Sequence, residues 1–271
     1  MKLKELAYLL GLKPPLRTYG VEVLCVDLSG EGCIDFARWL HPRDRGHGID
    51  QGMVDALRTF LRPGDVAIDI GAHCGDTAVP MALAVGRQGA VLALEPNPYV
   101  FPVLARNAEL NPDRTHIIPL MFAATPTDGE FEFEYSDAAF SNGGRHEGIS
   151  RWRHAHAFQL KVQGRNLQNY LRAEHASLVP RLRYVKVDAE GYDLTILRSL
   201  EDTLLETRPF IRAEVYRHTR RARRIKMIGF FERLGYTVYK FGGERAYRGE
   251  HVSAADVMRW THYDIFCVPA G

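Results

Sequence analysis

The chain has 271 residues, of which 46% are hydrophobic and 25% are charged, and its formal net charge at pH 7 is +2. This composition allows a sizeable core and is ordinary for one large α/β domain with an appendage. The net charge is too small to imply a polyanionic partner held by bulk attraction. The four cysteines show no C-x-x-C spacing, so we expect neither a zinc site nor a disulfide framework, and reduced thiols in a cytoplasmic protein are the default.

Residues 1–62 predict a cap or lid region. Residues 1–15 favour a short amphipathic helix over a targeting signal, because Glu5 interrupts the basic end and no small-residue cleavage site follows. Two β-like runs over 21–28 and 34–40 indicate a hairpin. No segment approaches the roughly 20 apolar residues that cross a bilayer, so we expect no membrane partner.

A polar loop over residues 41–50 follows the hairpin and contains several His and Asp residues. No helix or strand fixes their spacing, so a solvated loop or a substrate-facing lid is favoured over a metal site. Apolar residues then recur at helical spacing over 51–61, which predicts a helix that closes the cap before Pro63 and Gly64.

The most informative stretch begins at residue 66. An apolar, β-rich run over 66–70 leads into a turn with Gly71 and Gly75, and a helix is predicted over 77–85. Glycines allow the backbone to approach a ligand, and free amides at a helix start attract anionic groups. The next strand ends at Glu95, whose carboxylate can accept hydrogen bonds from both ribose hydroxyls. A nucleoside cofactor is therefore expected above this turn.

The glycine spacing separates two classes of cofactor. A dinucleotide requires G-x-G-x-x-G near its pyrophosphate, whereas this chain has Asp69, Gly71 and Gly75 in the order D-x-G-x-x-x-G. That order resembles the first motif of class I methyltransferases, in which the glycines pass under the methionine part of the cofactor and the acid helps to hold its amino group. A glycine-rich turn that serves packing alone remains an equal alternative.

The rest of the chain alternates between β-like and helix-like segments, with an irregular His- and Arg-rich excursion over 137–157. Strands are expected near residues 116–122, 130–135, 158–162, 184–188, 210–214, 237–241 and 264–268. Helices are expected near 98–110, 167–171, 194–205 and 225–234. This alternation predicts an α/β fold with a doubly wound, mainly parallel sheet of about seven strands over residues 63–271.

Three acids fall at the ends of predicted strands, where such sheets bind their ligands. They are Glu95, Asp188 and Glu214. Each could cap a following helix or turn, but three at successive strand ends favour one shared crevice. Lys186 lies in an otherwise apolar strand, so a structural ion pair with a carboxylate is favoured over a catalytic role.

Residues 186–193 have the sequence KVDAEGYD, which resembles the K-x-D-x-E-G-x-[DE] signature of the FkbM family of methyltransferases. The similarity runs from about residue 63 to 214. It implies a Rossmann-like class I fold, the cofactor S-adenosylmethionine, and O-methylation of a hydroxyl on a small molecule such as a sugar or polyketide. The segments 140–145 and 165–168 depart from the family pattern near the substrate side, which leaves the acceptor open.

The turn, the second strand and the resemblance together predict a set of cofactor-binding residues. They are Asp69, Gly71, Ala72, His73, Gly75, Thr77, Glu95, Pro96, Asn97, Ala124 and Asp188. In similar enzymes a small residue at the position of Ala124 lies beside the adenine, but a simple turn explains Ala123 and Ala124 equally well.

The predicted catalytic residues are Asp188, Glu190 and Glu214. Asp188 is the first choice to accept the proton of the acceptor or to orient it, although it could instead hold the amino group of the cofactor. Glu190 either assists or fixes its loop. A divalent cation bound by Asp188 and Glu214 would activate the hydroxyl, but the sequence does not establish one. His146, His154 and His156 could supply a base or a metal ligand, and surface positions are favoured for them.

An arginine run over residues 217–224 follows Glu214 directly. It could steer an anionic small-molecule acceptor, but a solvated helix face is favoured. Two further hypotheses stay open, a nucleic-acid-binding methyltransferase that uses this run and a non-catalytic cofactor-binding protein. A nicotinamide-dependent reductase is a minor alternative. Nucleic acid is disfavoured because the run has no interleaved aromatic residues.

Overall fold

The computed structural model describes residues 17–42, 44, 48–135, 143–144 and 158–270. Its main sheet is built from eight strands, β3 (Val66–Ile70), β4 (Ala90–Leu94), β5 (Ile117–Leu120), β10 (Leu182–Val187), β11 (Phe210–Val215), β12 (Tyr236–Phe241), β13 (Arg248–His251) and β14 (Tyr263–Pro269). They lie in the order β13-β12-β14-β11-β10-β3-β4-β5. The predicted α/β, mainly parallel fold is confirmed.

The centre of the sheet is parallel and completely enclosed. Strands β3 and β4 pair in parallel, and every one of their residues is buried. Such apolar runs are typical of strands that are covered by helices on both faces. The strand beyond the expected seven is β13, an exposed edge strand whose sequence, RGEH, carries no apolar alternation. It pairs with β12 and extends the antiparallel edge of the sheet.

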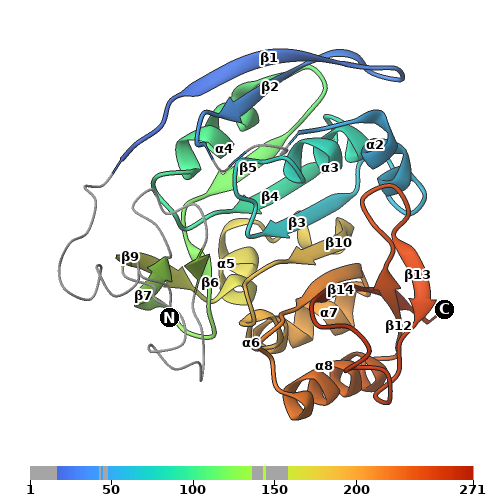
Figure 1. Ribbon diagram of the computed structural model, residues 1–271. Coiled ribbons are helices and arrows are strands. Elements are labelled where there is room, and N and C mark those ends of the chain that lie inside the picture. Colours follow the sequence, from blue (N-terminus) through green and yellow to red (C-terminus); the bar gives the residue numbers. More distant parts are fainter. Residues whose placement is uncertain (1–16, 43, 45–47, 136–142, 145–157, 271) are drawn as a thin grey trace.

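Helices cover both faces of the sheet (Figure 1). One face carries α2 (Gln51–Arg58), α3 (Ala78–Val85) and α4 (Phe101–Glu109). The other carries α5 (Leu167–Glu174), α6 (Asp193–Ser199), α7 (Glu201–Thr207) and α8 (Arg221–Arg233), with a short 3₁₀ turn over Val179–Arg181. The helix expected near 194–205 is therefore two helices, which change direction at Leu200.

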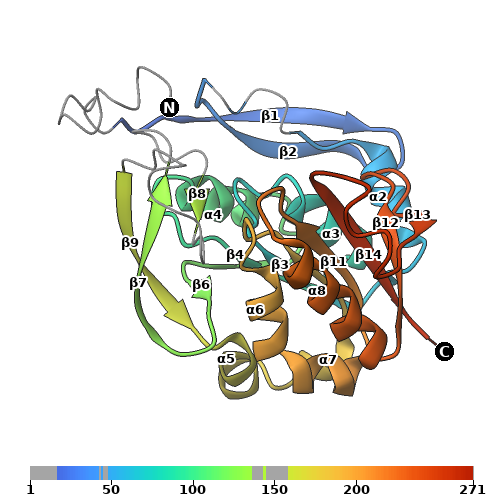
Figure 2. The same ribbon diagram turned by 60° about the horizontal axis from the view of Figure 1, so that its bottom comes forward.

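The predicted hairpin is present as β1 (Val21–Leu28) and β2 (Gly32–Trp39). It lies across the outside of α2, α3 and α4 (Figures 1 and 2). Ile34 and Phe36 of the hairpin share an apolar cluster with Val54 of α2 and Val79 of α3. Every residue of α3 is buried because this outer layer covers the side that would otherwise face water. The boundary at residue 62 stays a prediction.

The expectation of four reduced thiols is wrong for two of them. Cys25 and Cys33 form a disulfide across the hairpin, with their Cα atoms 5.4 Å apart. Their spacing in the sequence gives no signal, because only the strand register brings them together. Cys74 and Cys267 are free and buried.

A second, smaller sheet stands beside the main one. It contains β6 (Ala123–Ala124), β7 (Gly129–Tyr135), β8 (Gly143–Gly144) and β9 (Phe158–Arg165), in the order β6-β9-β7-β8. Ala124 pairs in parallel with Arg165, so Ala123 and Ala124 form a short strand and not a simple turn. Figure 2 shows this sheet at the side of the molecule away from β12 and β13.

Several sequence expectations fall outside the described residues. These are the helix over 1–15, most of the excursion over 137–157, and the histidines His146, His154 and His156. None of the helices in the described part of the chain is long and apolar enough to span a bilayer.

Candidate cofactor and acceptor site

The glycine turn after β3 and the KVDAEGYD motif at the end of β10 meet at the carboxyl ends of the strands, which form one edge of the sheet. Gly71 follows β3 with a φ of 80°, and a Cβ at this position would overlap the carbonyl oxygen of Asp188, which follows β10. The amide of Asp188 donates to the carbonyl of Ile70 at 3.0 Å. Gly71 is therefore required where two strand ends touch. The missing side chain at Gly71 makes room for the chain itself, so the packing alternative accounts for this glycine.

A buried ion pair fixes the base of this edge. Lys186 Nζ lies 3.0 Å from Asp69 Oδ1 and donates to the carbonyl of Gly71 at 3.2 Å. Thr77 Oγ1 donates to the other carboxylate oxygen of Asp69 at 2.5 Å. Burial lowers the pKa of Lys186, but the carboxylates of Asp69 and Asp188 outweigh burial and raise it above its usual value. The structural ion pair expected for Lys186 is confirmed.

These contacts change the role open to Asp69. Its side chain is 0% exposed, and both carboxylate oxygens accept hydrogen bonds from within the protein. It holds β3, β10 and the start of α3 in register. We therefore place Asp69 behind the site as a residue that positions the glycine turn, and the exposed carboxylate of Asp188, at 46% exposure, is the nearer candidate for a cofactor amino group.

Glu95, which follows β4, has the geometry of a ribose acceptor. One of its oxygens accepts from the backbone amide of His73 at 3.0 Å, and the other accepts from the amide of Asn97 at 2.9 Å. His73 has a φ of 48°, so a strained backbone aims its amide at this carboxylate. Burial raises the pKa of Glu95 to about 7, although both amide bonds oppose the shift. A buried carboxylate with lone pairs to spare fits two hydroxyl donors.

The remaining predicted cofactor residues surround the same turn or its neighbouring strand ends. Ala72 and Gly75 are buried in the turn, and Gly75, with a φ of 96°, packs against Leu104. Asn97 is buried, and its side chain accepts from the amide of Tyr99. Pro96 is half-buried between Glu95 and Asn97. Ala124 is buried in β6, in the second sheet.

Acidic side chains crowd the ends of β10 and β11. Asp193, the first residue of α6, accepts hydrogen bonds from the amides of Gly191 and Glu214, both at 3.1 Å. Burial, with the charge of Asp188, raises the pKa of Glu190 to about 7. Burial, followed by the charges of Asp193 and Asp188, also raises the pKa of Glu214 well above its usual range. Asp193 fills the last acidic position of the K-x-D-x-E-G-x-[DE] signature, and its hydrogen bonds tie the ends of β10 and β11 together.

The potential metal ligands that the structure brings together are not the two acids considered for a divalent cation. In the described part of the chain, the group with three ligand atoms within 4.8 Å of one another is Asp44, His73 and Cys74. Asp188 and Glu214 do not belong to it. Burial holds the pKa of the Cys74 thiol well above its usual value, so this sulfur is a poor ligand in its resting state.

The loop after β2 contributes to the cofactor side. His41 and Asp44 are both buried, so the solvated loop that we favoured is wrong for these two residues. The ring of His41 stacks on Trp39, whose own ring meets His73 edge to face. Asp44 Oδ1 lies 3.8 Å from His73 Nδ1. The cap therefore packs directly on the glycine turn.

The arginine run is not one solvated face. Arg224 is 2% exposed, and its guanidinium donates to the carbonyls of Thr219, Tyr216, Arg217, Val257, Trp260 and Thr261. Arg217, Arg220 and Arg221 remain exposed. Arg224 thus has a structural role, and the exposed arginines of the run are the ones that could bind an anionic ligand.

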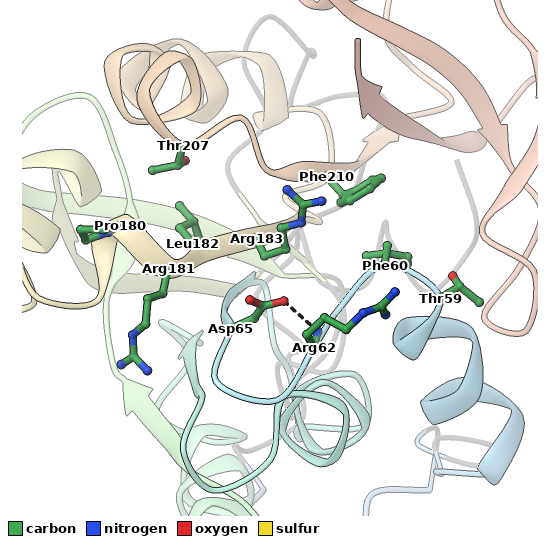
Figure 3. Close-up of a pocket in the computed structure, with 10 residues that line it drawn as sticks. All are labelled: Thr59, Phe60, Arg62, Asp65, Pro180, Arg181, Leu182, Arg183, Thr207 and Phe210. Carbon is green, nitrogen blue, oxygen red and sulfur yellow. Dashed lines mark hydrogen bonds between the residues drawn. The ribbon is translucent and has the colours of Figure 1, made fainter. Parts of the chain in front are cut away.

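A pocket of about 480 Å³ lies at the amino ends of the strands, on the side of the sheet opposite the candidate site (Figure 3). Leu182 and Phe210, the first residues of β10 and β11, line it. The side chains of Arg62, Arg181 and Arg183 point in different directions and do not converge on one anion. Doubly wound sheets bind their ligands at the carboxyl ends of the strands, so this pocket is separate from the candidate site.

The strand order and the glycine turn after β3 define a class I methyltransferase-like fold. The family model described as the methyltransferase FkbM domain matches residues 69–238, more than half of the chain. The chain therefore belongs to the FkbM methyltransferase family, and the predicted resemblance is confirmed. Membership makes S-adenosylmethionine the cofactor.

A curated relative and two solved structures add to this comparison. The hexuronic acid methyltransferase AglP of Haloferax volcanii is 27% identical over 160 residues, which span 57% of this chain and 59% of that protein. The crystal structure of an FkbM methyltransferase from Methylobacillus flagellatus is 13% identical, with a TM-score of 0.44 over 79% of this chain and 50% of that one. Fibrillarin of Aeropyrum pernix, solved with bound S-adenosyl-L-methionine, is 15% identical, with a TM-score of 0.45 over 95% and 86%.

The residues at the edge suit this cofactor. Glu95 offers a buried carboxylate for the ribose hydroxyls, and Asp188 offers an exposed carboxylate beside the turn. A cationic ligand is favoured there, because a positive charge is attracted to carboxylates. S-adenosylmethionine carries both an ammonium group and a sulfonium.

Proposed function

We propose that this protein transfers a methyl group from S-adenosylmethionine to a hydroxyl oxygen of a sugar, with a hexuronic acid as the first candidate acceptor. The observation that carries the proposal is the contact between Gly71 and Asp188. It sets the cofactor turn beside the acids Asp188, Glu190 and Glu214. Methyl transfer requires adjacent cofactor and acceptor sites, because the acceptor oxygen must approach the methyl carbon in line with the carbon–sulfur bond.

Each part of the edge has a role in the proposal. Glu95 holds the ribose, and the turn from Gly71 to Gly75 lies under the methionine part. The bound S-adenosylmethionine supplies the methyl group on a sulfonium. Asp188 either binds the cofactor amino group or orients the acceptor, since its carboxylate is exposed at the point where the two motifs touch. Glu190 and Glu214 complete the acceptor side.

An anionic acceptor is supported by one relative and by local charge. The relative in Haloferax volcanii is named for hexuronic acid. In this chain the exposed guanidinium of Arg217 lies over the Tyr216 ring, at 5.8 Å from its centroid. It could pair with a carboxylate of the acceptor and offset the repulsion from the acidic cluster. Arg224 cannot serve in this way, because backbone carbonyls occupy its guanidinium.

The test is methyl transfer from isotopically labelled S-adenosylmethionine to glucuronic and galacturonic acids, with glucose as the neutral control and mass spectrometry as the readout. Mild alkali distinguishes the products, since a methyl ester is hydrolysed and a methyl ether survives. We expect an alkali-stable product that is strongly reduced in Asp188→Asn. A purely alkali-labile product would contradict hydroxyl methylation. No product from any sugar, with cofactor binding intact, would contradict the acceptor class.

A nucleic-acid acceptor remains the alternative. The exposed Arg217, Arg220 and Arg221 favour it, and the burial of Arg224 weakens it, because one of the cations in the run is withdrawn from the surface. Binding of single-stranded RNA that falls steeply with salt would support this alternative.

A further inference from the structure

Glu214 and His262, which lie far apart in the sequence, form a pair at the proposed acceptor side. Glu214, near the end of β11, is 7% exposed, and its Oε1 lies 3.4 Å from His262 Nε2. Its other oxygen, Oε2, is buried and has no hydrogen-bond partner among the residues that the structure describes. His262 lies in the loop just before β14, and its side chain is 49% exposed. The carboxylate is enclosed while the imidazole reaches solvent.

The pair lies on the same edge as the cofactor turn. Val187 pairs with Ile70 on one side and with Ala213 on the other. The residues that follow, Gly71 and Glu214, therefore lie on strands that flank β10. Neighbouring strands are separated by about 4.8 Å, so Glu214 lies on the order of 10 Å from the glycine turn. That interval is suited to a cofactor methyl group and an acceptor lying between them.

Arg224 fixes the two loops that carry this pair. Its guanidinium donates to the carbonyls of Tyr216 and Arg217, just after Glu214, at 3.2 and 3.4 Å. It also donates to the carbonyls of Trp260 and Thr261, just before His262, at 2.8 and 2.6 Å. A planar group with five donors is suited to holding two loops at once. The buried cation of the arginine run thus sets the distance between Glu214 and His262.

We propose that His262 is the general base that removes the proton from the acceptor hydroxyl, with Glu214 orienting the imidazole and Arg224 acting as a positioning residue. This inference rests on the proposed hydroxyl methylation. Because Nε2 lies 3.4 Å from Glu214 Oε1, a proton on Nε2 faces the carboxyl group and leaves the lone pair of Nδ1 for the hydroxyl proton. As the proton passes to Nδ1, the hydroxyl oxygen bonds to the methyl carbon. The bond from carbon to sulfur breaks, and its electron pair stays on sulfur.

Several ionisable groups surround the pair. Besides Glu214, they are Asp188 and Glu190 after β10, Asp193 on α6, Asp264 on β14 and Tyr216, whose ring meets His262 edge to face. Asp188 then orients the acceptor or the cofactor and does not need to take the proton.

The first test needs no acceptor. Nitrogen NMR of ¹⁵N-histidine-labelled protein reports which imidazole nitrogen carries the proton, and Glu214→Leu removes its partner. We expect His262 to hold its proton on Nε2 in the wild type and to lose this preference in Glu214→Leu. The same His262 shifts in both folded proteins would overturn the pairing.

The second test measures catalysis with the sugar acids. We expect His262→Ala to lower kcat about 100- to 10,000-fold, the usual contribution of a positioned base. Its affinity for S-adenosylhomocysteine should be unchanged, and added imidazole should restore part of the rate. The control is His251→Ala on the exposed strand β13, which should keep full activity.

The outcomes separate the two proposals. Wild-type hydroxyl methylation with an undiminished kcat in His262→Ala would overturn the base while the proposed function stands. An alkali-labile ester as the only product would overturn both, because a carboxylate acceptor has no proton to remove. A loss of rate that imidazole does not restore, with cofactor affinity also lost, would mark His262 as structural and overturn its role as the base.

Discussion

Lys186 Nζ and Asp69 Oδ1 lie 3.0 Å apart, and the two side chains are 4% and 0% exposed. Asp69 belongs to β3 and Lys186 to β10, so the ion pair joins these two strands directly beneath the site. Because the same lysine also lies 3.7 Å from Asp188, the ion pair connects the buried base of the edge with its exposed acids.

Removal of the lysine charge should therefore destabilise the fold. In Lys186→Met the carboxylate of Asp69 stays buried with only Thr77 as a donor, and we expect a loss of about 3–5 kcal/mol in the free energy of unfolding. Urea denaturation measures it. Arg38→Ala, which breaks an exposed pair with Glu22, is the control and should change stability far less. Equal effects of the two substitutions would contradict the structural role of Lys186.

Gly71→Ala should disrupt the meeting of the two motifs. Its Cβ would overlap the Asp188 carbonyl, and its φ of 80° disfavours any other residue. We expect at least a tenfold loss in affinity for S-adenosylhomocysteine, measured by calorimetry. The matched control is Gly64→Ala, a glycine that also has a positive φ but has open space at its Cβ position. Unchanged affinity in Gly71→Ala would show that the contact is not needed.

Glu95 should make cofactor binding depend on pH. Burial raises its pKa to about 7, above the ordinary value of 4.5, so the folded protein binds this proton more tightly than the unfolded chain. Raising the pH from about 4.5 to 7 thus costs stability, and the ionised carboxylate is complete only above pH 7. If ribose hydroxyls bind the ionised form, affinity should rise about tenfold between pH 6 and pH 8.

Two variants isolate that effect. Glu95→Gln should bind more weakly and lose the pH dependence. Glu190→Gln should keep it, although the pKa of Glu190 is also raised to about 7. Calorimetry at the three pH values 6, 7 and 8 measures both. If the pH dependence disappears in Glu190→Gln and survives in Glu95→Gln, it arises from Glu190, and its assignment to Glu95 is contradicted.

Arg224→Leu should reveal a structural hub inside a run of surface arginines. Six carbonyls would lose their donor, and we expect a loss of about 3–5 kcal/mol in the free energy of unfolding. Arg221→Ala on the same helix is exposed and should have little effect. Thermal denaturation compares them. A stable Arg224→Leu protein would contradict the account of the two loops.

Local sequence signals predicted the centre of the molecule well. Strands β3 and β4 are short apolar runs, and each is followed by a turn or an acid. Strands that are buried on both faces need apolar residues at nearly every position, so their sequences are continuous apolar runs without alternation. The pairing of Lys186 with a carboxylate followed from the same physics, since a lone buried ammonium is too costly. Glu95 and Asp188 directly follow β4 and β10, and Glu214 lies one residue before the end of β11. The three acids therefore lie at carboxyl ends of strands, but the strands are not consecutive, because β3 separates β4 from β10.

What the sequence missed depends on tertiary contacts. Arg224 looks like any other residue of an exposed run until the loops near Tyr216 and Trp260 fold against it. His262 is far in sequence from Glu214, and only the antiparallel register of β11 and β14 brings them together. The disulfide between Cys25 and Cys33 likewise follows from strand pairing and not from spacing.

The central claim is that the edge formed by Gly71, Glu95 and Asp188 binds S-adenosylmethionine. Calorimetry of the purified protein with S-adenosylmethionine and S-adenosylhomocysteine, beside Glu95→Ala, tests it most directly. The account predicts micromolar binding of both ligands to the wild type and its loss in a folded Glu95→Ala protein. No binding to well-folded wild-type protein, or equal binding to the variant, would contradict it.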